Sequence, residues 1–254
     1  TIDSDLQRGA YRILEKNIRD IILSKMTDSI TSFEITEETD GSDIQIPAAD
    51  VYASILSYVA DRDHFYADDA SEAEQQMRGI LDSYLDSVKV GISSELTSVR
   101  TPYDKLTAEY REYCSYIVRA LYDRGVLVRD RVDTDDEIYD EWTYDGTESM
   151  GSFLYHAAEE GWIDTDILGA SSGSTDEIFE ALVEYILDEP CEDYSVGDIV
   201  CRYMAESGAV LGDLVCRILF DQEVFDPNET VQEEIESGSS RAAYNYIRDL
   251  IKRN

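Results

Sequence analysis

The chain contains 254 residues, of which 56 are acidic and 21 are basic, and its formal net charge at pH 7 is −35. Hydrophobic residues make up 43% of the chain and aromatic residues 10%, a content that supplies a buried core and excludes a disordered acidic polypeptide. The sequence has no run of about 18 apolar residues, and its first ten residues lack a signal-peptide pattern, so we expect neither membrane insertion nor secretion.

The kind of charged residue is as informative as the total. Arginine outnumbers lysine by 16 to 5, and aspartate outnumbers glutamate by 31 to 25. Repulsion among so many carboxylates opposes a compact fold, but at 1 M salt the Debye length is about 3 Å, which removes most of that repulsion. The composition resembles that of proteins from salt-accumulating haloarchaea and from their viruses. This resemblance implies a halophilic protein, located in a high-salt cytoplasm or in a virion.

Helical signals recur along the whole chain. Apolar residues follow the three- and four-residue spacing of a helix face in the segments 6–21, 77–92, 106–121, 178–186 and 199–218. Helix starts carry the capping-box pattern, in which a Ser or Thr is followed three residues later by an acid or amide: Ser4–Gln7, Ser71–Glu74, Thr101–Asp104, Ser174–Glu177, Ser195–Asp198 and Thr230–Glu233. The sequence therefore predicts a mainly α, multi-helix, bundle-like architecture.

Two segments depart from the helical pattern. Residues Ser29–Thr36 alternate apolar and polar side chains, which is the period of a strand. Residues Gly125–Arg131 leave a predicted helix through a glycine into β-branched side chains, and Ile138–Tyr144 follows a turn-rich stretch. Phe153–Ile163 shows the same passage from helix to extended chain as Tyr116–Val126. We expect at most one or two small β-hairpins, near residues 29–36 and 125–144.

Charge changes abruptly near residue 132. Residues 132–201 contain 21 acids and no lysine or arginine, whereas residues 1–131 carry a net charge of −10 and residues 202–254 a net charge of −4. The step predicts an N-terminal helical unit over 1–131 and an acidic C-terminal helical unit over 132–254. One acidic face of a single domain explains the step equally well, so both organisations stay open.

Motifs for catalysis and for nucleotide loops are missing from the sequence. It contains neither a GxGxxG pattern nor a Walker-type lysine loop, and His64 and His156 are its only histidines. The four cysteines lack CxxC spacing and lie at apolar positions of predicted helices, which predicts buried thiols and a reducing compartment. We therefore expect a non-enzymatic protein without a cofactor.

One acidic cluster around a histidine is a candidate metal site. Asp61, Asp63 and His64 lie within four residues of one another and offer carboxylate and imidazole ligands to a divalent cation. Acids are dense throughout this chain, so clustering of this kind also arises by chance.

The scarce basic residues include a second candidate site. Arg119, Arg124, Arg129 and Arg131 fall within thirteen residues. Together with Gly125 they resemble the end of a winged helix-turn-helix, in which a recognition helix passes through glycine into a hairpin wing, over about 30 residues. The resemblance implies a nucleic-acid-binding regulator. The alternative is that these arginines pair with neighbouring acids and with a helix C-terminus.

Tyrosine is unusually frequent, with 18 tyrosines against 6 phenylalanines. Tyr110, Tyr113 and Tyr116 recur every three residues along one predicted helix. A tyrosine ring can be buried while its hydroxyl stays in water, which suits both cores and interfaces. These three residues are candidate interface residues, with packing inside the chain as the alternative.

Three functions stay open from the sequence. The first is a non-enzymatic interaction or assembly protein of a haloarchaeon or of its virus, bound to protein partners or to copies of itself. The second is the winged-helix-like, DNA-associated regulator, and the third is a metal-dependent enzyme. A membrane partner is not expected, because the acidic surface would be repelled by anionic lipid.

Overall fold

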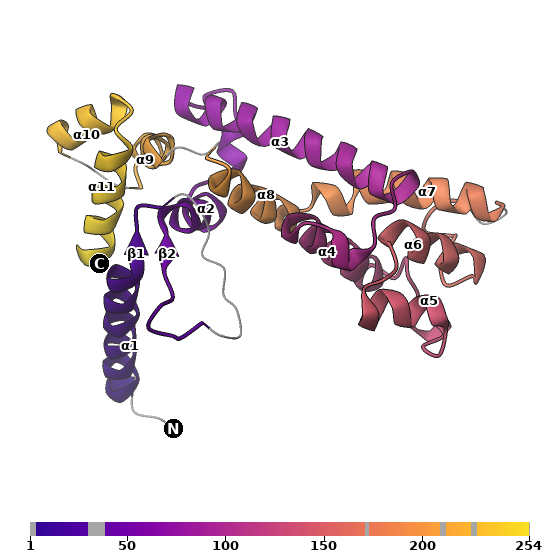
Figure 1. The fold of residues 1–254 in the computed structure, drawn as a ribbon. Helices are drawn as coiled ribbons and strands as arrows, with labels where there is room; N and C mark the ends of the chain where they lie inside the picture. The colour runs from indigo at the N-terminus through magenta and orange to yellow at the C-terminus, as the bar shows by residue number, and fades with distance from the viewer. Residues whose placement is uncertain (1–3, 30–38, 171–172, 209–211, 225–227, 254) are drawn as a thin grey trace. The chain divides into compact units, whose positions relative to one another are not determined.

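The computed structural model describes residues 4–29, 39–170, 173–208, 212–224 and 228–253 (Figure 1). Over these residues the chain forms eleven α-helices, five short 3-10 or π turns and one pair of two-residue strands, which confirms the predicted mainly α architecture. The chain divides into two compact units. Unit 1 contains Thr1–Leu81 and Cys201–Asn254, and unit 2 contains Asp82–Val200.

Unit 1 combines both ends of the chain. It contains α1 (Ser4–Lys25), β1 (Met26–Thr27), β2 (Ile46–Pro47), α2 (Ala48–Tyr58), η1 (Asp63–Tyr66), the beginning of α3 (Glu72–Thr97), the end of α8 (Tyr194–Glu206), α9 (Gly212–Asp221), α10 (Glu229–Glu236) and α11 (Ser240–Arg253). The strands pair in parallel, with Met26 opposite Ile46. Helix α9 is central to the packing, because it contacts α2, α10 and α11. Its buried residues include Leu214, Ile218 and Leu219.

Unit 2 is continuous in sequence. It contains the rest of α3, η2 (Tyr103–Lys105), α4 (Ala108–Asp123), η3 (Arg129–Arg131), α5 (Glu137–Asp140), η4 (Glu141–Asp145), α6 (Met150–Glu159), α7 (Thr175–Asp188), η5 (Pro190–Glu192) and the beginning of α8. Helix α6 packs on α7. The core of unit 2 includes Tyr113, Ile117, Phe153, Leu182 and Ile186.

Helix starts agree only in part with the capping patterns. Ser174 and Glu177 form the predicted capping box of α7. Thr101 does not begin a helix, because its backbone N–H and hydroxyl bond to Glu95, and α4 begins seven residues later behind the cap Thr107. The cap of α10 is Asn228, two residues before the predicted Thr230.

Residues 125–144 do not form a hairpin. The extended residues after Gly125 do exist, but Leu127 pairs in an antiparallel bridge with Ile163, the second helix-to-extended ending noted in the sequence. Gly125 and Gly161 both have the positive φ that ends a helix. Residues 138–144 are helical instead, because the Asp136 carboxylate accepts two backbone N–H bonds and caps α5. The other expected hairpin, 29–36, lies outside the described residues apart from Ser29.

The step in charge at residue 132 falls inside unit 2, so it does not coincide with the division between the units.

All four thiols are buried and none forms a disulfide, as their spacing predicted. Burial raises the pKa of the Cys114, Cys191 and Cys216 thiols to about 12, so these groups are unreactive. None of the helices in the described part of the chain is both long and apolar enough to span a bilayer.

Candidate interaction surface

Helix α1 exposes an apolar face. Tyr11, Leu14, Ile18 and Ile21 are 63%, 54%, 48% and 58% exposed. Their spacing of three and four residues places them on one side of the helix, where a helix of a globular protein is normally buried. In this 22-residue helix the face that should lie against a core therefore lies open among the described residues.

A groove continues this face into unit 1. It has a volume of about 520 Å³ and is lined mainly by aliphatic side chains of three helices, with one charged pair of residues, Glu15 and Arg19 of α1. The aliphatic residues include Ile18 and Ile22 of α1, Val51 and Ile55 of α2, and Ile247 and Ile251 of α11. Helices α1 and α11 contact each other and carry the indigo and yellow ends of the chain in Figure 1. Because Leu14 lies one helical turn from Ile18, the open face and the groove form one apolar surface.

The two outer helices of the groove carry a positive charge in an acidic chain. The sequence of α1 has five bases and three acids, and that of α11 has four bases and one acid. The other 218 residues hold 52 acids and 12 bases. Arg12, Lys16, Arg248 and Lys252 are exposed, and no ion pair joins them to another described residue. The two helices α1 and α11 that line the groove therefore carry a net positive charge, whereas the rest of the chain is acidic.

The tyrosine stripe of α4 packs inside unit 2. Tyr113 is wholly buried, and its hydroxyl donates to Glu109 Oε1 at 3.1 Å. The hydroxyl oxygen of Tyr110 packs against Gly91, and it lies only 1.8 Å from the position that a Cβ on this glycine would occupy. Tyr116 donates to Asp193 Oδ2 at 2.6 Å. These three tyrosines therefore make contacts within unit 2, which is the alternative of packing inside the chain. A face of exposed apolar side chains lies on α1.

The four arginines expected to bind nucleic acid differ in their contacts. Arg124 pairs with Glu189 and Asp193, and Arg131 donates to the carbonyl of Ile163 at 3.0 Å. Both therefore have partners within unit 2, and the hairpin that would form a wing is not present in residues 125–144. Arg119 and Arg129 line a common cavity.

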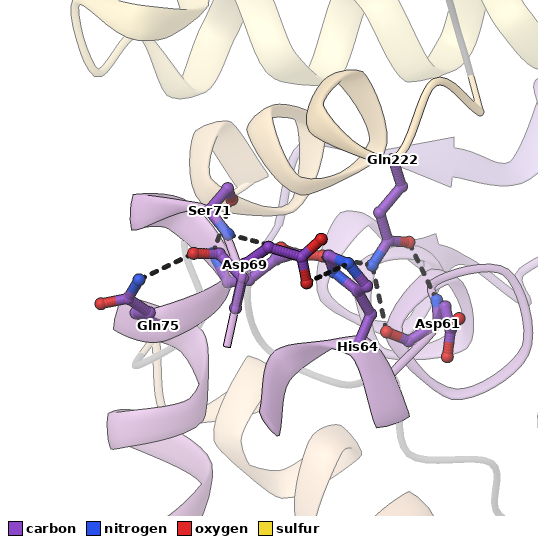
Figure 2. A network of polar contacts seen from close by, with 8 residues as sticks. Asp61, His64, Asp69, Ser71, Gln75 and Gln222 are labelled. Carbon is purple, nitrogen blue, oxygen red and sulfur yellow. Dashed lines mark hydrogen bonds and ion pairs between the residues drawn. The ribbon is translucent and has the colours of Figure 1, made fainter. Parts of the chain in front are cut away.

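The histidine of the candidate metal cluster belongs to a hydrogen-bond network in unit 1 (Figure 2). His64 Nδ1 lies 2.8 Å from Glu74 Oε1 and His64 Nε2 lies 3.5 Å from Asp69. The amide of Gln222 donates to the Glu74 carboxylate at 2.7 Å and to the Asp61 carbonyl at 3.0 Å. No group of three or more potential metal ligands gathers among the described residues, so Asp61, Asp63 and His64 are not brought together as a ligand set.

Glu74 is the centre of this network. It is 1% exposed and completes the predicted capping box of α3, since its carboxylate accepts the N–H of Ser71 and its own N–H donates to Ser71 Oγ. Burial alone would raise the pKa of Glu74, but hydrogen bonds from Gln222, Ser71 and His64 bring it below its usual value. The hydrogen bond to Glu74 and the negative charge of that group raise the pKa of His64. The network joins the residues before α3 to the end of α9.

The apolar spacing of residues 6–21 predicts a helix face in α1, but the spacing does not show that this face lies open, and the groove was not predicted. A signal was present, because the segment 4–25 has a net charge of +2 in a chain of net charge −35. The contributions of α2 and α11 to the groove could not be predicted, since 181 residues separate these helices in sequence.

Comparison with known proteins does not add to this picture. The chain matches no family model, and no curated protein or solved structure is significantly similar to it.

Proposed function

We propose that this chain is a non-enzymatic interaction protein whose unit 1 binds an acidic amphipathic helix of a partner protein. The observation that carries the proposal is the exposed apolar face of α1, continuous with the groove of α1, α2 and α11. A helix laid into an apolar groove through side chains three and four residues apart is a common mode of recognition.

The apolar residues supply the affinity. Full burial of a Leu or Ile side chain contributes about 1.5–3 kcal/mol. Leu14 and Ile18 are half exposed, so covering them contributes about half of that each, before the cost of association is subtracted. The stretch from Tyr11 to Ile22 rises by about 17 Å along α1, which is the length of three turns of a partner helix.

The charges select the partner. The net positive charge of α1 and α11 attracts a helix whose polar face is acidic and repels a basic one. A symmetric pairing with the same groove of a second copy is disfavoured, because the positive helices α1 and α11 of the two copies would face each other. The halophilic composition fits the same proposal, since partners from a salt-rich compartment would carry acidic helices too, in a cellular complex or in a virion.

Synthetic peptides test the proposal directly. Two fluorescein-labelled helices of about 22 residues share leucines at the a and d heptad positions and differ in having glutamate or lysine on the polar face. Fluorescence anisotropy in 1 M KCl should show the acidic peptide binding more tightly than the basic one, and the difference should narrow as KCl is raised to 3 M, because salt screens exposed charges. Leu14→Asp should weaken that binding by about tenfold or more, because it places a charge in the apolar face.

Val90→Asp is the matched control, because Val90 is 72% exposed on α3, outside both the apolar face of α1 and the groove, and it should leave the affinity unchanged. Equal losses in both variants would contradict the proposed face. Light scattering that showed a dimer dissociated by Leu14→Asp would assign the groove to a second copy. Preferential binding to phosphatidylglycerol vesicles over the acidic peptide would overturn the choice of a protein partner.

A further inference from the structure

Unit 2 contains two cavities along one face of α4. The first, of about 590 Å³, is lined by Arg111, Ser115, Tyr116, Arg119 and Ser195 among others. The second, of about 500 Å³, is lined by Val118, Tyr122, Tyr139 and Trp142 among others. Tyr103, Ser115 and Arg119 line both, so the two cavities adjoin. One ligand can therefore occupy both.

The first cavity offers cations without acidic partners. Unit 2 has 29 acids and only 8 bases, and its basic side chains commonly pair with a carboxylate, as Lys89, Arg124 and Arg129 do. Arg111 and Arg119 are exposed and form no ion pair with another described residue. They lie two helical turns apart with Ser115 between them, about 12 Å along α4.

Hydroxyl groups complete the polar lining. Ser115 Oγ lies 2.8 Å from the hydroxyl of Tyr103, and Ser195 contributes a third hydroxyl from the beginning of α8. Guanidinium and hydroxyl donors together are the groups that bind phosphate. The lining also contains the carboxylate of Glu112. This carboxylate would repel a bound phosphate, and the positive charges of Arg111 and Arg119 would offset that repulsion.

The second cavity offers aromatic surfaces. Trp142 meets Tyr103 edge to face at a centroid distance of 5.3 Å and is stacked on Phe153 from behind at 5.4 Å, which holds its ring in place. Arg129 lies over the ring of Tyr122 at 4.6 Å. Aromatic rings beside arginines are the surfaces on which nucleobases stack, each for about 1–3 kcal/mol.

We propose that this double cavity binds a nucleotide, with the phosphate between Arg111 and Arg119 and the base against Tyr122 and Trp142. The order of groups along α4 matches that ligand, because phosphate and base are joined by one sugar and the cavities are joined through Tyr103 and Ser115. The nucleotide is either free or part of a single strand of nucleic acid, since the same base and phosphate occur in both. This site is independent of the groove in unit 1.

Calorimetry on the full chain tests the proposal with three probes, adenosine 5′-monophosphate, adenosine and inorganic phosphate. We use 1 M KCl, where the repulsion by distant carboxylates is screened. The monophosphate should bind at least about tenfold more tightly than either fragment, because only it fills both cavities. Binding of the monophosphate should also change the fluorescence emission of Trp142. Phosphate alone binding as tightly as the monophosphate would overturn the aromatic half of the site.

Variants locate the site. Arg119→Gln should weaken binding of the monophosphate by about tenfold or more, since it removes a charge-assisted bond to phosphate, while helical circular dichroism stays unchanged. Lys105→Gln removes the same charge from an exposed residue outside both cavities and should have no effect. An oligonucleotide of eight deoxyadenosines that displaces the monophosphate at lower concentration would identify single-stranded nucleic acid as the source, and a weaker oligonucleotide would identify the free nucleotide. Absence of binding by both, or equal binding by Arg119→Gln, would refute the site.

Discussion

His64 Nδ1 lies 2.8 Å from Glu74 Oε1, which joins a partly exposed imidazole to a carboxylate that is 1% exposed. A buried carboxylate is tolerated only where donors surround it. Here the donors come from three places in unit 1: His64 of η1, Ser71 before α3, and Gln222 after α9. The pair therefore links the charge of one group to the packing of several segments.

Stability should depend on pH through this pair. The pKa of His64 is raised above 6.5, so its contribution is complete below pH 6.5 and is lost as the pH rises through the folded pKa. The pKa of Glu74 is lowered from 4.5, so its contribution is complete above pH 4.5 and is lost as the pH falls through the folded pKa. Chemical unfolding at a series of pH values should show that the pair contributes most to the free energy of unfolding between pH 4.5 and pH 6.5. His64→Gln should flatten the decline on the alkaline side, and an unchanged slope would contradict the assignment.

Removal of the Glu74 carboxylate should destabilise the fold. Glu74→Ala leaves the N–H of Ser71 and the amide of Gln222 without their acceptor, and such a loss at a buried site costs about 3 kcal/mol. Chemical unfolding measures the difference. Glu72→Ala is the comparison, because Glu72 lies in the same helical turn but is exposed, and it should change the free energy of unfolding by less than about 0.5 kcal/mol.

Two helical glycines should respond oppositely to alanine. A Cβ on Gly151 would lie 2.3 Å from the backbone carbonyl oxygen of Leu96, so Gly151→Ala forces α6 away from α3 and should cost about 1–3 kcal/mol. Gly79 has open space around its Cβ position, and Gly79→Ala should stabilise α3 by up to about 1 kcal/mol. Melting temperatures of the two variants, measured in the same buffer, check both signs.

Dilution of salt should unfold the protein. With a net charge of −35, repulsion among carboxylates grows as the Debye length increases from about 3 Å at 1 M salt to about 30 Å at 0.01 M. Helical circular dichroism should therefore decrease on dialysis from 3 M KCl to low salt and return when salt is restored. Full helicity at about 0.05 M salt, where the Debye length exceeds 10 Å, would contradict the prediction of salt adaptation.

The sequence was sufficient for local structure and insufficient for pairings across the chain. The capping box of Ser174 and the burial of the four cysteines follow from neighbouring residues, and both were predicted. Thr101 carries an equally good capping pattern, but Glu95 of the preceding helix takes its N–H and hydroxyl. The extended residue Leu127 was expected to find a partner near residues 138–144, and it pairs with Ile163 instead.

Candidate sites were harder to predict for a related reason. The apolar periodicity of α1 shows which side is apolar, but burial depends on whether another helix covers it, and Leu14 remains open. Arg119 was identified from the scarcity of bases, whereas Arg111 was not. Its importance depends on the cavity that it shares with Arg119 and Ser195, which only the folded chain brings together.

The division of unit 1 between both ends of the chain also has a consequence for biosynthesis. Tyr52 of α2 packs so closely against Gly212 of α9 that a Cβ on this glycine would lie 2.4 Å from the tyrosine ring, and the ribosome must add the 159 residues that separate the two. At about 5–20 residues per second this takes on the order of ten seconds. During that interval the side of α2 that packs on α9 has no partner, so the nascent N-terminal segment exposes apolar surface until the C-terminal helices of unit 1 have been made.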